Sequence, residues 1–256
     1  MYLLVMGCSA SIWDIWFDSQ YYNPVNLLQG IGGIATAGAL FYAFKQNLSG
    51  KVQQFESTFF KLIDLHNNII SYLNYRSIKH NPITEEIDSD ITYKGKQVFH
   101  SARLELTRAL NKEEIRSYIT KETFTNSYEK IENIEQAKRV FKNQYYSKYY
   151  SHFETELNHY FRNLFHIIKY LDQSSLINTT QKKFYASIIR AQLSQDELYV
   201  WMFNSMQINY GYPKVLYLIT KYDMMQNFRF EMIKPQIWWQ YFEYLKDTAR
   251  KPKGWQ

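Results

Sequence analysis

Three histidines spaced seven residues apart are the first residues in this chain that could do chemistry. They are His152, His159 and His166, in a stretch with a helical pattern. Glu156 and His159 form the Glu-x-x-His unit that di-iron helical bundles use twice, but the sequence holds no second copy of it. The acidic cluster of residues 85–90 lacks the alternating ligand spacing of a calcium loop. We therefore expect neither a metal site nor a cofactor.

Arg162 and His166 place a cation and a general acid or base on the same helix, with three residues between them. Helical ribonucleases of the HEPN class use an Arg and a following His in this way, usually at a somewhat longer spacing. No carboxylate that would orient the histidine is evident nearby. One hypothesis is a ribonuclease built on these two residues. The plainer one is that Arg162 stabilises the charge of a partner.

The charge of the chain favours an anionic partner. The 256 residues carry a formal net charge of +6, with no Lys or Arg before Lys45. A basic surface of this kind suits nucleic acid or the negative face of a bilayer. Next to Lys142 and Lys148 lies a group of tyrosines that could stack nucleobases or pack as a helix face: Tyr145, Tyr146, Tyr149 and Tyr150. The single cysteine, Cys8, excludes an internal disulfide and favours a reducing cytoplasm.

The first element that could position these residues is an uncharged stretch near the start of the chain. Residues 24–44, PVNLLQGIGGIATAGALFYAF, are long enough for a helix across a bilayer. The pairs Gly32/Thr36 and Gly33/Ala37 are small residues four apart, a spacing that lets helices pack closely in lipid. We predict a membrane span here, with a glycine-containing core helix as the alternative.

The predicted anchor covers residues 1–45. A second apolar run at 2–17 could form the first arm of a membrane hairpin, although Asp14 interrupts it. Lys45, Lys51 and Lys61 follow the stretch at once, so the positive-inside rule places the rest of the chain in the cytoplasm. The expected location is the bacterial inner membrane, with the bulk of the chain, residues 46–256, cytoplasmic.

The remainder reads as an all-α bundle. Apolar residues recur at helical spacing over 46–76 and, most clearly, over 147–171. Residues 77–97 are predicted to be a loop with a short strand near ITY. Further helices are expected at 97–110, 112–119 and 126–142, after Asn178-Thr179-Thr180 through Phe184 and Ile189, after Ser194, and after Pro213 and Pro235. Ser194 and Glu197 match a capping box, which predicts a helix start.

Several stretches resemble phage abortive-infection proteins of the AbiC type. The resemblance rests on HYFRNLFHIIKYLD, KKFYASIIRAQLSQDEL and YVWMFNSM, with FFKLIDLHNNII and YKGKQVFHSARLEL as earlier landmarks. It covers residues 25–228 and is most specific from Tyr160 to Asn204. The matching motif residues are Tyr160, Arg162, Tyr185, Arg190, Leu193, Ser194, Glu197 and Asn204. The resemblance implies a role in abortive infection and assigns these residues no chemistry.

The leading functional hypothesis is a membrane-anchored effector of antiphage defence. After a trigger it would perturb the membrane through self-association of the small-residue faces. The expected partners are the inner membrane and either a second copy of the chain or a sensor or neutralising protein, with nucleic acid possible through the basic surface. A membrane-tethered ribonuclease using Arg162 and His166 is the rival. The third hypothesis is a non-catalytic module that binds nucleic acid or a partner protein within a defence complex.

Overall fold

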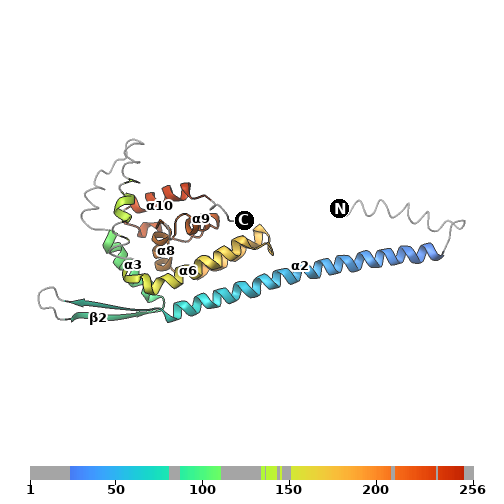
Figure 1. Cartoon of the computed structure of the whole chain (residues 1–256), viewed down its shortest axis with the longest axis horizontal. Helices are drawn as coiled ribbons and strands as arrows, with labels where there is room; N and C mark the ends of the chain where they lie inside the picture. Colours follow the sequence, from blue (N-terminus) through green and yellow to red (C-terminus); the bar gives the residue numbers. More distant parts are fainter. Residues whose placement is uncertain are drawn as a thin grey trace. The chain divides into compact units, whose positions relative to one another are not determined.

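A computed structural model describes residues 24–80, 87–110, 134–135, 137–142, 145, 151–208, 211–234 and 236–250. The chain forms two compact units, Met1–Gln54 and Phe55–Gln256. The described part is mostly helical, as predicted, with one two-stranded sheet (Figure 1). Its elements are α2 (Pro24–Tyr72), β1 (Asn74–His80), β2 (Ile87–Lys94), α3 (Gln97–Leu110), α6 (Ser151–Gln173), α7 (Thr179–Gln192), α8 (Gln195–Ser205), α9 (Lys214–Lys221), η2 (Phe230–Met232) and α10 (Ile237–Thr248).

The predicted membrane span is not borne out. Within the described part of the chain, no helix combines the length and the apolar character that a bilayer crossing requires. The prediction of a span at 24–44, and of transmembrane segment(s) in the fold class, is therefore wrong. It was based on the absence of charge, whereas glycines, Thr36 and amide side chains are uncharged without adding much apolar surface. The hairpin arm expected at 2–17 lies outside the described residues.

The stretch that was predicted as a loop instead contains a hairpin. Strand β1 pairs with β2 in antiparallel register, with Tyr75 opposite Tyr93 and an irregularity at Lys79/His80. The rings of Tyr75 and Tyr93 stack across the strands, and Arg76 forms a bidentate ion pair with Asp90. The short strand predicted near ITY is confirmed, because residues 91–93 belong to β2.

The core of the second unit is centred on α8. Residues 197–205 of this helix are all buried, so it is covered on every side, which is the position of a central helix. Helix α3 packs against α8, and α6 packs against α7 and α9. Figure 1 draws α8 among α3, α6, α9 and α10. The periodic stripe of α6 supplies the facing apolar side chains, among them Leu157, Leu164, Ile168 and Leu171.

Candidate functional site

The first turn of α8 lies where the sequence places it. Ser194 has an extended backbone, and its hydroxyl accepts a hydrogen bond from the amide of Glu197 at 3.2 Å. The carboxylate of Glu197 in turn accepts from the amide of Ser194 at 2.8 Å. The capping box is therefore confirmed, and it satisfies two first-turn amides that have no partner within the helix. It also fixes the direction in which the side chains of Asp196 and Glu197 project from α8.

Glu197 is the most deeply buried carboxylate of the described residues, with 0% exposure. The hydroxyl of Tyr160 on α6 donates to its Oε1 at 3.1 Å, and the ammonium of Lys96 lies 3.1 Å from its Oε2. Burial, and then the charge and hydrogen bond of Glu197, raise the pKa of Tyr160 well above its usual value. This tyrosine therefore stays protonated and acts as a donor. One carboxylate thus joins α6, α8 and the residue before α3.

His66, on α2, lies beside this network. Its ring is 4.7 Å from that of Tyr160, and its Nδ1 is 3.3 Å from the amide nitrogen of Asn163. Burial lowers the pKa of His66 to about 4, with Glu197 opposing the shift and Lys96 adding to it. The imidazole is therefore neutral at pH 7. Its Nε2 is buried and has no hydrogen-bond partner among the described residues.

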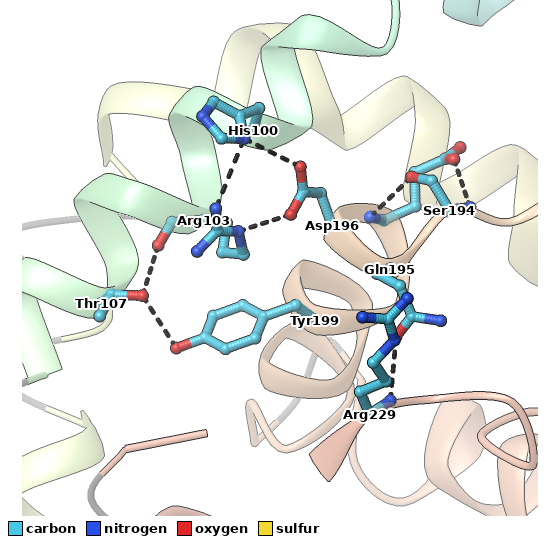
Figure 2. Close-up of polar contacts among 9 residues, drawn as sticks. His100, Arg103, Thr107, Ser194, Gln195, Asp196, Tyr199 and Arg229 are labelled. Carbon is cyan, nitrogen blue, oxygen red and sulfur yellow. Dashed lines mark hydrogen bonds and ion pairs between the residues drawn. The ribbon is translucent and has the colours of Figure 1, made fainter. Parts of the chain in front are cut away.

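A second cluster, which we call the α3–α8 cluster, consists of His100, Arg103 and Asp196 (Figure 2). Nδ1 of His100 is 3.1 Å from Oδ2 of Asp196, and Nε of Arg103 donates to Oδ1 of the same carboxylate at 2.5 Å. The side chain of His100 is 51% exposed, whereas those of Arg103 and Asp196 are 21% and 25% exposed. The carboxylate is thus held between two partners, and the imidazole faces solvent.

Neighbouring contacts hold this cluster in place. Thr107 donates to the backbone carbonyl of Arg103 at 2.8 Å, and its hydroxyl lies 3.1 Å from that of the buried Tyr199. On the other side of α8, the Gln195 side chain accepts from the amide of Arg229, as Figure 2 shows. The cluster therefore lies on two packed helices rather than on a loop, and such support holds a side chain in a defined orientation.

The α3–α8 cluster has the chemistry of an oriented histidine. Nδ1 of His100 also lies 3.4 Å from Nη2 of Arg103. In the tautomer with the proton on Nδ1, the carboxylate of Asp196 accepts from it, and Nε2 is left to exchange a proton with a substrate. Arg103, whose Nε is held by Asp196, adds a guanidinium beside this histidine, and a guanidinium can bind a phosphate oxygen. A dyad of this kind can act as a general base on a phosphate ester without a metal.

Three of the motif residues predicted from sequence meet in the structure, and the others lie in separate places. Tyr160, Ser194 and Glu197 meet in one network, as described above. Tyr185 lies apart from it, where its hydroxyl donates to Glu56 at 2.5 Å. Arg190 donates to the backbone carbonyl of Asp223 at 2.8 Å. Leu193 is the C-cap of α7, and Asn204 is buried in α8.

The residues predicted for catalysis lie on α6, and those predicted for membrane packing lie on α2. Arg162 and His166 are exposed on α6, and among the described residues neither is joined by a hydrogen bond to a carboxylate. Gly32, Gly33, Thr36 and Ala37 all lie in α2, where Thr36 and Ala37 are exposed. His159 is exposed as well, and no group of potential metal ligands occurs in the described ranges.

Sequence reasoning missed His100, Arg103 and Asp196. Asp196 is separated from His100 by 96 positions, so no local spacing joins them. One signal was present, because His100 and Arg103 lie three residues apart within VFHSARLEL and so share one face of a helix. Nothing in that pattern shows that the face meets a carboxylate.

Comparison with known proteins supports the sequence resemblance over part of the chain. Neither a curated protein nor a solved structure matches this sequence. The matched region spans α6 to the end of η2, about a third of the chain, and so contains Tyr160, Asp196 and Glu197 but not His100 or Arg103. The earlier landmarks, FFKLIDLHNNII and YKGKQVFHSARLEL, lie outside it. Residues 152–233 match the family described as putative phage abortive infection protein.

Proposed function

We propose that this chain is a phage abortive-infection protein that cleaves RNA at the α3–α8 cluster. The family match supports the role in defence. The observation that carries the chemistry is the half-exposed imidazole of His100, oriented by Asp196 at 3.1 Å and flanked by Arg103. The basic character of the chain, +6 overall, suits a polyanionic substrate.

The reaction uses a nucleophile that RNA carries itself. Nε2 of His100 accepts the proton of a ribose 2′-hydroxyl, whose oxygen attacks the adjacent phosphorus. The bond from phosphorus to the 5′ oxygen breaks, and that oxygen takes a proton from water. The products are a 2′,3′-cyclic phosphate and a 5′-hydroxyl. Nε of Arg103 is held by Asp196 and its Nη2 lies against Nδ1 of His100, so its remaining N–H groups stabilise the charge on the phosphoryl oxygens.

This site differs from the ribonuclease hypothesis built on Arg162 and His166. Both hypotheses use a histidine and an arginine. Of the two histidines, only His100 lies within hydrogen-bond distance of a carboxylate among the described residues. An orienting carboxylate fixes the tautomer that a general base needs. The exposed pair on α6 is therefore the weaker candidate, and it serves as an internal comparison.

The test is cleavage of an end-labelled RNA oligonucleotide by the purified full chain in the presence of a chelator. His100→Ala should lower the cleavage rate by about 100-fold or more, since general-base catalysis contributes on that scale. The matched control is His159→Ala, which removes an exposed histidine from α6. Cells that carry each variant are then challenged with phage.

Three outcomes contradict the proposal. Equal cleavage by the His100→Ala variant and the wild type would exclude His100 as the base. RNA that is bound but not cut, together with intact phage protection, would indicate the non-catalytic binding module instead. Loss of cleavage in His166→Ala but not in His100→Ala would restore the ribonuclease hypothesis on α6.

A further inference from the structure

A pocket of about 260 Å³ lies outside the α3–α8 cluster, between α9, η2 and α10. Its wall is aromatic. Phe230 stacks on Trp239 with ring centroids 5.4 Å apart and planes 24° apart, and Trp239 stacks on Phe242 at 5.3 Å and 29°. Phe230 is 47% exposed and Trp239 is half-buried. A large ring that is left exposed over a second ring offers a flat surface for a planar ligand.

The polar side of the pocket carries acceptors and an amide. Asp223 and Gln226, in the turn after α9, line it together with Glu243 and Lys246. Glu243 and Lys246 are paired with each other at 2.9 Å. For Asp223 the described contacts include no ion pair. The net charge of the lining is therefore negative, which disfavours a phosphate and favours a group that donates hydrogen bonds.

The turn that bears Asp223 is held in a defined conformation. Asp223 has φ 48°, in the left-handed region that Asp and Asn tolerate better than most residues. Its backbone carbonyl accepts the hydrogen bond from Arg190 on α7. The amide of Met224 donates to the carbonyl of Ile219, and that of Gln226 to the carbonyl of Asp223. The backbone that bears this acceptor is thus fixed before any ligand binds, which lowers the entropy cost of binding.

We propose that this pocket binds a nucleobase that carries an exocyclic amino group. The base stacks on the aromatic wall of Phe230 and Trp239, as bases do on aromatic side chains in nucleic-acid-binding proteins. Asp223 accepts a hydrogen bond from the amino group, and the amide of Gln226 reads a ring nitrogen. The volume suits one base rather than a longer segment. This site goes beyond the proposed cleavage at His100 and does not depend on it.

The test measures binding of adenosine and of inosine to the purified full chain by isothermal titration calorimetry. The two nucleosides differ in that inosine has a carbonyl where adenosine has the amino group. Saturable binding is expected, with adenosine preferred. Phe230→Ala should weaken adenosine binding at least tenfold, whereas Phe184→Ala should not change it. Phe184 is a matched control because it is 60% exposed on α7 and does not line the pocket.

Asp223→Asn tests the assigned acceptor, because it replaces a carboxylate that can only accept with an amide that can also donate to the carbonyl of inosine. It keeps the size of the side chain and tolerates the same backbone conformation, so the fold should persist. The variant should lose the preference for adenosine over inosine. The proposal is overturned by any of three results: no saturable binding of adenosine, unchanged binding in a folded Phe230→Ala variant, or a preference for inosine in the wild type. Circular dichroism of each variant shows that it is folded.

Discussion

Two regions of this chain depart from the usual rule of burial in opposite directions. In α2, the apolar side chains of Leu40, Phe41 and Tyr42 are 68%, 71% and 68% exposed. At the start of α8, the carboxylate of Glu197 is 0% exposed. From hydrophobicity alone, the apolar side chains of α2 would be expected to be buried and Glu197 would be expected to be exposed. The difference shows that burial follows the partners that an element meets, not the polarity of a residue.

The physical reason lies in what each side chain gains from its neighbours. Burying a carboxylate has a large desolvation cost unless hydrogen bonds and an opposite charge offset it. Glu197 has both, from Tyr160, from the amide of Ser194 and from Lys96. A Cβ added at Gly38 of α2 would meet no atom within 4 Å. Apolar side chains in such surroundings gain no burial, whatever their hydrophobicity.

Among changes at the buried start of α8 and in the exposed part of α2, the largest effect is expected from Glu197→Ala. This change leaves the hydroxyl of Tyr160 buried without its acceptor and removes one half of the capping box. We expect the free energy of unfolding to fall by about 3 kcal/mol. Urea denaturation followed by tryptophan fluorescence measures it, and Glu231→Ala, at an exposed position, is the control. A loss below about 1 kcal/mol would mean that the buried network stabilises the fold little.

A smaller effect is expected from pH, through His66. The pKa of His66 in the folded chain is about 4, below its ordinary value of 6.5. Between pH 4 and pH 6.5 the imidazole is therefore protonated in the unfolded chain but not in the folded one. Stability that is present above pH 6.5 is therefore lost as the pH falls toward 4. Between pH 7 and pH 5 the loss is about 2 kcal/mol. His66→Gln should flatten this dependence, whereas His159→Ala should not. Parallel curves for wild type and His66→Gln would exclude His66 as the cause.

The smallest effect is expected from Leu40→Ala. Because Leu40 is 68% exposed, its truncation should change the free energy of unfolding by less than about 0.5 kcal/mol. The comparison is Leu164→Ala, which truncates the same residue type where it is 0% exposed and should lose about 2–5 kcal/mol. If Leu40→Ala destabilises by more than about 1 kcal/mol and the melting temperature depends on protein concentration, this face is covered by a second copy.

The local elements could be predicted because their signals are local. Helix α3 was predicted at 97–110, and the structure has it at Gln97–Leu110. The start of α8 followed from Ser194 and Glu197, three residues apart. The hairpin was missed because its contacts join two different strands. Arg76 and Asp90, for example, are 14 positions apart, and no local pattern in the sequence pairs them.

The candidate site was predicted only in part for the same reason. Tyr160, Ser194 and Glu197 were selected through a family resemblance, and the structure brings them together. His100 and Asp196 were not selected from the sequence, because their two side chains meet only when α3 packs against α8. The membrane span was wrong for a related reason. It treated a lack of charge as apolar character, and the two are not the same property.

The sequence by itself determined the helical character, the capping box at Ser194, the apolar stripe of α6 and the resemblance to abortive-infection proteins. All of these depend on residues within a few positions of one another or on a recognisable local pattern. Only the tertiary structure decided that Glu197 is buried, that His100 meets Asp196, and that Phe230 and Trp239 form the wall of a pocket. Each of those depends on which helices pack together, because contact between residues that are distant in the chain is set by the fold and not by their spacing.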